Sequence, residues 1–375
     1  MAGAVVTIRN AGVRAIYRCV VRPILFSLDP ERVHDRTVRL GRFAGSSSFL
    51  RRAVGACSGY ADKLLEQDIL GIKFRNPVGL AAGFDKNAEL LDILPSIGFG
   101  FAEVGSITGE PCAGNPKPRL WRLPRSKAIA VYYGLKNDGC EAVAGRMRGK
   151  TFKIPVGVSI AKTNSPATVP TDAGIADYVK AYAAFSEIGD YDTLNVSCPN
   201  AYGGEPFMEP SRFDALLAAI QRVRNKKPLF LKFSPDADEK TLDALLEIAE
   251  GRSVDGFVCT NVTKERRRDR IRDSFVPEKG GLSGKLVQDL SDKIIAHVYR
   301  RAKGNRIIIG VGGIFSAEDA YRKIKLGASL VQLITGMIFE GPQVISDINR
   351  GLARLLARDG FRDISEARGI DHGRG

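Results

Sequence analysis

The sequence predicts an α/β protein, a (β/α)8 TIM barrel preceded by a separate helical segment. From residue 70 onwards, short apolar runs alternate with amphipathic stretches of helical periodicity, and there are eight such runs. Strands that alternate with helices predict a parallel sheet, and eight repeats predict that the sheet closes into a barrel. A chain of 375 residues with 44% hydrophobic residues is large enough to build that core.

Residues 1–65 carry helix signals but none of these strand patterns. Asp29-Pro30 predicts a helix start, because Asp is a favoured N-cap and Pro a favoured first helical residue. The segment Gly45–Ser48 ends this helix, and a second short helix is expected from Phe49. We therefore expect a helical, membrane-associating module in residues 1–65 and a catalytic barrel in residues 66–375.

The strands and helices of the barrel follow in order along the chain. The predicted strands are Val78–Ala82, Phe101–Gly105, Val156–Ile160, Thr193–Val196, Leu229–Phe233, Gly256–Thr260, Ile307–Gly310 and Leu330–Ile334. Helices predicted between and after them include Asp214–Val223, Thr241–Ala249, Ala317–Leu326 and Val344–Leu356. The rival fold, an open doubly wound sheet, requires a glycine fingerprint on its first turn, and Gly79–Gly83 matches that fingerprint poorly.

Basic residues concentrate near the N-terminus. The net charge is +14, and ten arginines against three acids give residues 1–52 a charge of +7. No nucleic-acid partner is expected, because these arginines are not interleaved with stacking aromatic residues. Arg14, Arg18 and Arg22 instead recur every four residues among aliphatic residues, which is typical of an amphipathic helix on an anionic membrane.

Two other interpretations of this basic segment stay open: a solvated helix packed on the barrel, and a mitochondrial transit peptide, since no acid precedes Asp29. No run of about 20 uncharged apolar residues occurs, so no spanning helix is expected. The expected location is the cytoplasmic face of a bacterial inner membrane, with the mitochondrial inner membrane as the alternative.

Cysteine and histidine usage argues against a metal site. The six cysteines form no CxxC pair, which excludes common zinc and disulfide patterns and indicates a reducing compartment. Only three histidines occur. We therefore expect no bound metal.

Barrel enzymes place their chemistry at the carboxyl ends of the strands. The predicted strand ends carry Gly83 with Lys86, Gly105-Ser106, Ser159, Asn195 with Cys198, Lys232, Asn261, Gly312-Gly313 and Thr335-Gly336. Asn195 and Asn200 bracket Cys198, and two carboxamides suit a flat polar ring on which the thiol can act as base or nucleophile. A buried structural cysteine is the alternative.

Two glycine clusters predict a phosphate site. Gly280–Gly284 is expected to open the helix after strand six, and Gly310–Gly313 follows strand seven. Backbone amides in such loops bind phosphate, although tight turns also favour glycine. Lys232 can place charge beside an electron-rich cofactor or form a Schiff base as in a barrel aldolase. A phosphate beside a planar ring indicates flavin mononucleotide, FMN.

The chain resembles the dihydroorotate dehydrogenase family from residue 23 to residue 370. The motifs that carry the resemblance are Leu28-Asp29-Pro30-Glu31 with His34, Phe74–Gly79, Ala81–Lys86, Glu103–Ser106, Gly114–Pro116 through Arg122–Pro124, Asn195–Asn200, Gly280–Gly284 and Gly310–Gly313. The helical module resembles the membrane-associated, quinone-reducing class, in which it forms a tunnel to the flavin.

The resemblance implies FMN-dependent oxidation of dihydroorotate to orotate with electrons passed to a quinone, in pyrimidine synthesis. It places Cys198 as the base, and Lys86, Asn195, Asn200 and Asn261 at the substrate. It implies flavin contacts at Ala82, Gly83, Gly105, Ser106, Ser159, Lys232, Ser283, Gly284, Gly312, Gly313, Thr335 and Gly336. His34 and Arg122 stand at quinone positions.

The chain departs from this family at several site positions. The quinone-reducing class normally uses serine as base, and cysteine marks the soluble class. Val131 replaces a substrate-binding asparagine, Val262 a hydroxyl residue, and Ile334 a tyrosine. A second hypothesis is therefore a flavin enzyme of the same family that acts on another dihydropyrimidine or a cyclic enone. A third is a catalytically silent flavin-binding membrane protein.

Overall fold

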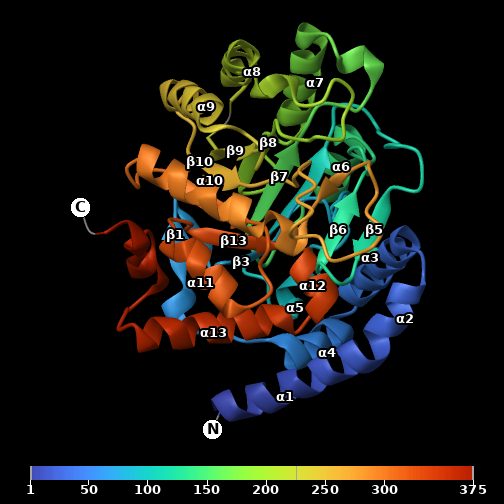
Figure 1. Ribbon diagram of the computed structural model, residues 1–375, viewed down its shortest axis with the longest axis vertical. Helices are drawn as coiled ribbons and strands as arrows, with labels where there is room; N and C mark the ends of the chain where they lie inside the picture. The colour runs from blue at the N-terminus through green and yellow to red at the C-terminus, as the bar shows by residue number, and fades with distance from the viewer. Residues whose placement is uncertain (1, 225, 374–375) are drawn as a thin grey trace.

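A closed barrel of eight strands forms the centre of the computed structural model, which describes residues 2–224 and 226–373 (Figure 1). The strand order is β10-β12-β13-β3-β4-β7-β8-β9, and each neighbouring pair is parallel. The strands are β3 (Val78–Leu80), β4 (Phe101–Ile107), β7 (Val156–Ile160), β8 (Tyr191–Asn195), β9 (Leu229–Phe233), β10 (Gly256–Cys259), β12 (Ile307–Val311) and β13 (Leu330–Leu333). The predicted fold class is confirmed.

Helices surround the barrel on its outside (Figure 1). They are α5 (Leu94–Ile97), α6 (Cys140–Met147), α7 (Thr171–Ala184), α8 (Pro210–Arg222), α9 (Glu239–Gly251), α10 (Gln288–Arg301), α11 (Ala317–Lys325), α12 (Thr335–Glu340) and α13 (Val344–Arg358). Helix α8 begins at Pro210 rather than at the predicted Asp214. The reason is local: Glu209 accepts hydrogen bonds from the amides of Ser211 and Arg212, and Pro210 occupies the first turn.

Two small antiparallel sheets were not predicted. Strands β1 (Gln67–Ile69) and β2 (Ile72–Phe74) pair with each other, and their apolar side chains join the barrel interior. Strands β5 (Leu120–Leu123), β6 (Ala128–Val131) and β11 (Gly281–Leu282) form the second sheet. Gly280–Gly284 therefore does not open a long helix directly, because Gly281–Leu282 first pairs with β6 and α10 starts only at Gln288.

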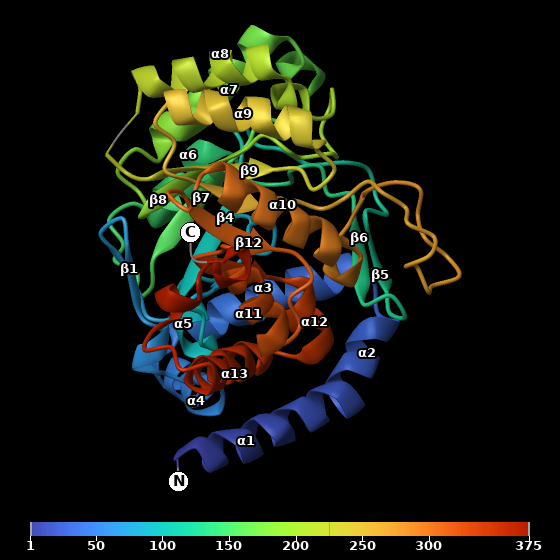
Figure 2. The same ribbon diagram turned by 60° about the vertical axis from the view of Figure 1, so that its left-hand side comes forward.

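The N-terminal segment is helical, as predicted. It consists of α1 (Ala2–Ile16), a π-helical turn (Tyr17–Val21), α2 (Arg22–Ser27), α3 (Pro30–Ser46) and α4 (Ser48–Ser58). Asp29 caps α3 by accepting a hydrogen bond from the Arg32 amide at 2.8 Å, which confirms the predicted helix start. Helix α1 runs along one end of the molecule beside α4 and α13, and α2 continues from it toward β5 and α12 (Figure 2).

The spaced arginines attach these helices to the barrel rather than facing outward. The contacts are Arg14 with Asp347 Oδ2 at 2.6 Å, Arg18 with the Glu340 carboxylate, and Arg22 Nη1 with the Phe339 carbonyl at 3.1 Å. These partners belong to α12 and α13. These three arginines therefore help to pack the helices on the barrel, and contact of the segment with an anionic surface stays a prediction.

The N-terminal helices also expose many large apolar side chains to solvent, next to exposed arginines such as Arg36 and Arg39. Large hydrophobic side chains exposed there are Val5, Ile8, Ile16, Val20, Val21, Ile24, Leu28, Leu40, Phe43 and Phe49. Within residues 2–224 and 226–373, no helix is both long and apolar enough to cross a bilayer. Exposed apolar patches of this kind mark interaction surfaces.

Candidate active site

One cavity of about 730 Å³ joins the barrel mouth to the N-terminal helices. Its polar end lies at the carboxyl ends of the barrel strands, where Asn195, Cys198, Lys232 and Asn261 line it. Its other end, the apolar arm, is lined mainly by side chains of α1, α2, α3 and neighbouring elements: Val13, Ile16, Tyr17, Val21, Leu25, Phe26, Val33, Thr37, Ile93, Leu94, Ile97 and Ile338. A mostly apolar pocket with a few converging polar groups is typical of a small-molecule site.

The carboxamides at the polar end form a connected hydrogen-bond network. Asn195 Nδ2 donates to Ser106 Oγ at 2.8 Å. Asn261 Nδ2 donates to Asn195 Oδ1 at 3.1 Å and to the Ser197 carbonyl at 2.7 Å. These contacts fix both side chains in one orientation, which preorganises a polar site.

Asn200 is oriented by a different element. The side-chain Nδ2 of Asn200 donates to the backbone carbonyl of Val131 in β6 at 2.9 Å. The backbone carbonyl of Asn200 accepts a hydrogen bond from Asn115 Nδ2 at 2.9 Å. The unpredicted β5–β6–β11 sheet therefore forms one wall of the site. Val131 and Val262 both line the cavity beside these carboxamides.

Cys198 reaches the cavity from the loop that follows β8. Burial raises the pKa of its thiol to about 11, and the hydrogen bond from the Asn200 amide and the charges of Lys162 and Lys232 oppose that rise only in part. Cys198 is therefore a neutral thiol at neutral pH. It needs to lose a proton before it can act as a base.

Lys232 emerges from β9 and is 5% exposed. Burial lowers its pKa, while the charge of Glu103 raises it. Glu103 Oε1 and Gln332 Oε1 are buried and accept no hydrogen bond from the residues described. Because Lys232 and Gln332 line the cavity, this part of the barrel centre presents a cation and an acceptor to a bound group.

Glycine is required where the cavity meets the last strands. A Cβ on Gly313 would lie 2.3 Å from Gln288 Cβ, and one on Gly336 would lie 2.0 Å from the Ile314 carbonyl. A Cβ on Gly284 would lie 2.9 Å from Thr335 Cγ2. Close packing against neighbouring protein atoms therefore requires glycine at these three positions, and all three also line the cavity, as the glycines of phosphate-binding loops do.

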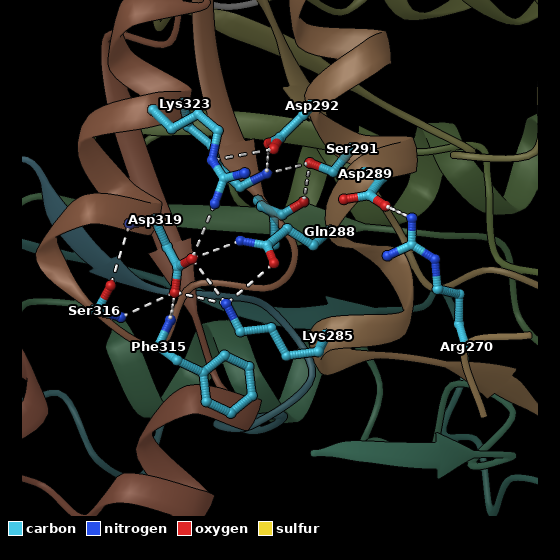
Figure 3. Close-up of polar contacts among 12 residues, drawn as sticks. Arg270, Lys285, Gln288, Asp289, Ser291, Asp292, Phe315, Ser316, Asp319 and Lys323 are labelled. Atoms are coloured by element: carbon cyan, nitrogen blue, oxygen red, sulfur yellow. Dashed lines mark hydrogen bonds and ion pairs between the residues drawn. The ribbon is translucent and has the colours of Figure 1, made fainter. Parts of the chain in front are cut away.

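A polar network behind this glycine cradle fixes its turn (Figure 3). Asp319 Oδ2 accepts from the amides of Phe315 and Ser316 at 2.9 and 3.1 Å, and Asp319 Oδ1 accepts from Lys285 Nζ at 2.7 Å. Gln288 Nε2 donates to the same Oδ1 at 2.6 Å. Burial alone would raise the pKa of Asp319, but Lys285 and Gln288 outweigh it and lower that pKa. The ionised Asp319 thus holds residues 315–316 in place.

A second buried network supports the preceding strand (Figure 3). Lys323 is 0% exposed, and its Nζ donates to Ser291 Oγ at 2.8 Å and to Asp292 Oδ1 at 2.7 Å. Ser291 Oγ donates to the Val311 carbonyl at 2.6 Å. Helices α10 and α11 are therefore tied to the end of β12, from which Gly312 and Gly313 follow.

The predicted site residues converge on this cavity with one exception. Lining it are Ala82, Gly83, Lys86, Gly105, Ser106, Asn195, Cys198, Asn200, Lys232, Asn261, Ser283, Gly284, Gly312, Gly313, Thr335 and Gly336, with His34 and Arg122 in the apolar arm. Ser159 is fully buried behind the lining and hydrogen-bonds Ser106 Oγ at 2.7 Å. Ser159 therefore does not line the cavity, and its hydroxyl supports Ser106, which does.

Two predicted ligand residues contact protein groups in this structure. Lys86 Nζ lies 3.3 Å from His34 Nε2, where the polar end meets the arm. Arg122 Nη1 donates to the Leu28 carbonyl at 2.8 Å, and its guanidinium lies 4.8 Å from the centre of the Phe26 ring.

Sequence reasoning missed Tyr133, Lys136, Gln332 and Tyr17, which also line the cavity. Tyr133 and Lys136 flank Gly134-Leu135 just after a short apolar run. This position, at the end of a possible strand, was the one sequence signal that could have identified them as lining residues. Tyr17 gave no signal, because its role depends on how α1 packs; its hydroxyl donates to the Ile338 carbonyl at 2.7 Å.

Comparison with known proteins gives a uniform result. The sequence profile of a family described as dihydroorotate dehydrogenase matches residues 64–356. A protein of Natronomonas pharaonis named dihydroorotate dehydrogenase (quinone) is 41% identical over 353 residues, which cover 94% of this chain and 98% of the relative. A protein of Gloeobacter violaceus with the same name is 40% identical and covers 94% of this chain.

The fold comparison agrees with the sequence comparison. A crystal structure titled as DHODH from Eimeria tenella in complex with ferulenol superposes with a TM-score of 0.81 at 30% identity. The match covers 92% of this chain and 96% of the Eimeria chain.

Proposed function

The chain belongs to the dihydroorotate dehydrogenase family, and we propose that it oxidises (S)-dihydroorotate to orotate in pyrimidine biosynthesis, with FMN as cofactor and a quinone as electron acceptor. The observation that carries this proposal is the single cavity. It connects a thiol and three carboxamides to a glycine cradle and then to an apolar arm. The names of the relatives support both the substrate and the acceptor.

The residues at the barrel mouth fit FMN. Gly284, Gly313 and Gly336 line the cavity, and backbone amides of such glycine loops are suited to bind the phosphate. Lys232 supplies a buried cation for the electron-rich ring, and Gln332 Oε1 supplies an unpaired acceptor. When bound, FMN accepts a hydride from the substrate and passes its electrons to a quinone.

Cys198 acts as the base, and the carboxamides hold the substrate. As a thiolate, Cys198 removes the proton from C5 of dihydroorotate while the hydride leaves C6. Asn195, Asn200 and Asn261 exchange their present hydrogen bonds for contacts with the polar edge of the substrate ring. Because these side chains are already oriented, little ordering remains to be done when substrate binds.

The apolar arm serves the quinone, and the N-terminal helices serve the membrane. Arg122 of β5 and His34 of α3 are polar groups that line the cavity at the arm. The exposed apolar side chains of α1–α4 suit shallow insertion at a bilayer surface, which is the mode of peripheral membrane helices. Residues 1–65 therefore form the membrane and quinone module, and residues 66–375 the catalytic barrel. A bacterial inner membrane is the proposed location.

One observation favours a second candidate substrate. Val131 and Val262 place apolar side chains beside Asn200 and Asn261, and Asn200 already donates to the Val131 carbonyl. Each lost hydrogen bond to a charged substrate costs about 1.5–3 kcal/mol. A cavity wall with Val131 and Val262 would therefore suit a less polar ring, such as another dihydropyrimidine or a cyclic enone.

Anaerobic spectroscopy of the FMN-loaded protein tests the proposed function. Dihydroorotate should bleach the flavin absorption, and a short-chain quinone should restore it. Bleaching by a neutral dihydropyrimidine but not by dihydroorotate would favour the second candidate. A purified protein without visible flavin absorption, and unable to bind added FMN, would refute both.

A further inference from the structure

Lys86 and His34 are two basic side chains in direct contact at the boundary between the substrate end and the apolar arm. Lys86 follows β3 in the Phe84-Asp85-Lys86 segment, and His34 comes from α3, so two separate elements bring them together. Lys86 Nζ lies 3.3 Å from His34 Nε2 and 4.1 Å from the centre of the Tyr133 ring. Both residues line the cavity.

The two nitrogens of the His34 ring have different surroundings. Nε2 lies 2.9 Å from the Phe84 carbonyl, so a proton on Nε2 is donated there. Nδ1 is buried and makes no hydrogen bond among the residues described, but Asp35 Oδ1 lies 3.5 Å away, so a proton on Nδ1 would have a carboxylate within electrostatic reach. The interaction with His34 is the main cause that lowers the pKa of Asp35 to about 2, and Asp35 is therefore an anion at neutral pH.

These two forms place opposite demands on Lys86. When Nε2 carries the proton, it has no lone pair for Lys86, and a neutral Lys86 amine is the compatible neighbour. When Nδ1 carries the proton, Nε2 accepts a hydrogen bond from a charged Lys86 ammonium. The arrangement with a charged Lys86 holds one proton more than the arrangement with a neutral Lys86. In it, the Phe84 carbonyl no longer receives a hydrogen bond from His34.

We propose that binding of the anionic substrate charges Lys86 and switches His34 from the Nε2 to the Nδ1 form, so that one proton is taken up from solvent for each anion bound. This inference rests on the proposed function, because it takes a carboxylate substrate as the ligand. The proton count balances: Lys86 Nζ gains one proton, and His34 keeps one proton at the other nitrogen.

The surroundings of Lys86 keep the two states close in free energy. Burial and then the charge of Lys136 lower the pKa of Lys86 to about 7. Asp35, Asp85 and Glu31 oppose this shift. Burial and Lys86 lower the pKa of His34, so the two residues are not both charged at neutral pH.

Other charged groups near the pair are already engaged. Glu31 pairs with Arg119 at 2.8 Å and also faces Lys117 and Lys136. Burial raises the pKa of Tyr133, which therefore stays a phenol. An incoming carboxylate is thus the group whose arrival changes the charge state of Lys86.

Proton uptake during orotate binding tests the proposal. The FMN-loaded enzyme is titrated with orotate, affinity is read from the shift in flavin absorption, and uptake is read from calorimetry in buffers of different ionisation enthalpy. Because the free-enzyme pKa of Lys86 is depressed, uptake should be near zero at about pH 5.5 and near one proton at about pH 8.5. Orotate affinity should fall as pH rises above about 7.

His34→Gln is the decisive variant. Its amide can donate to the Phe84 carbonyl and accept from a charged Lys86 at the same time, so the charged form of Lys86 gains an acceptor without any proton rearrangement and the pKa of Lys86 in the free enzyme should rise toward its ordinary value. Uptake at about pH 8.5 should then disappear, while orotate still shifts the flavin spectrum. Lys180→Gln, which removes a charge from an exposed pair with Glu110, should behave like the unmodified enzyme.

The outcomes separate this inference from the proposed function. Orotate binding with uptake that is zero or independent of pH would overturn the inference, as would full uptake in His34→Gln. Absence of any orotate binding at every pH would instead refute the proposed substrate. Loss of FMN from His34→Gln would move the test to the unmodified enzyme, whose pH series decides the inference alone.

Discussion

The polar end of the cavity and its apolar arm are held in place by different kinds of interaction. At the polar end, Asn195 and Asn261 lie at barrel strand ends and bond to each other, and Asn200 is held by the backbone of β6. The arm is assembled from helices that attach to the barrel through side chains such as Arg14 and Arg18, which are 42% exposed. Exposed ion pairs contribute little free energy. The polar end is therefore rigid, and the arm is the part that can adapt.

Replacing Cys198 should have the largest effect and should act on the polar end alone. General-base catalysis contributes about 10²–10⁴-fold to rate. We expect Cys198→Ala to bind FMN normally and to lose flavin reduction by dihydroorotate to that extent, as measured by stopped-flow absorption. Cys57→Ala, at an exposed thiol, is the matched control. Reduction of Cys198→Ala at the unmodified rate would refute the assignment of the base.

The pH dependence of flavin reduction should report the same thiol. The pKa of Cys198 is raised to about 11, so the thiolate fraction grows about tenfold per pH unit below that value. At saturating dihydroorotate, the reduction rate should therefore rise about a hundredfold from pH 7 to pH 9. Reoxidation by quinone should not follow this profile. A rate that is constant above about pH 7 would contradict a buried thiol as base.

Deleting residues 2–27 should affect the arm and spare the polar end. This deletion removes α1 and α2 but keeps α3, whose Glu31 pairs with the buried Arg119. Flavin reduction by dihydroorotate should be unchanged, while the KM for quinone should rise about tenfold or more because apolar contacts are lost. Flotation with anionic vesicles should also decrease. Unchanged quinone kinetics would show that the arm is not the quinone site.

Asp319→Asn should have the smallest effect, on FMN affinity. Asp319 holds the amides of Phe315 and Ser316 and pairs with Lys285, and loss of its charge weakens all three contacts. A loss of about 1–3 kcal/mol is expected, which corresponds to roughly tenfold or more in the FMN dissociation constant. Asp289→Asn removes a carboxylate that pairs with the exposed Arg270 in the same region and is the control (Figure 3). Equal FMN affinities in Asp319→Asn and Asp289→Asn would show that Asp319 does not support the FMN site.

The barrel could be predicted from sequence because its signals are local. Each predicted apolar run of four or five residues corresponds to one strand of the barrel. The cradle glycines, Cys198 and the three carboxamides followed from their positions at strand ends. The resemblance of whole motifs to one family then fixed the chemistry that local patterns left open.

The features that were missed depend on contacts between distant segments. Strand β11 pairs with β6 although Gly281 and Val131 lie far apart in the chain, and no periodicity reveals this. Lys86 meets His34 only because α3 packs over the barrel mouth. The arginine stripe was read correctly as one face of a helix, but the acidic residues Asp347 and Glu340 that it meets lie near the other end of the sequence.

The buried pair between Glu31 and Arg119 has a consequence for how bulky molecules reach the interior. Both side chains are 5% exposed, and their ion pair holds α3 against the segment that leads into β5. Separating the two residues would leave an unpaired charge in the protein interior, which is energetically unfavourable. Helix α2 has no buried residue. Displacing α3 would therefore break a buried ion pair, whereas displacing α2 would not, so we expect a hydrophobic compound too bulky for the apolar arm to shift α2 rather than α3.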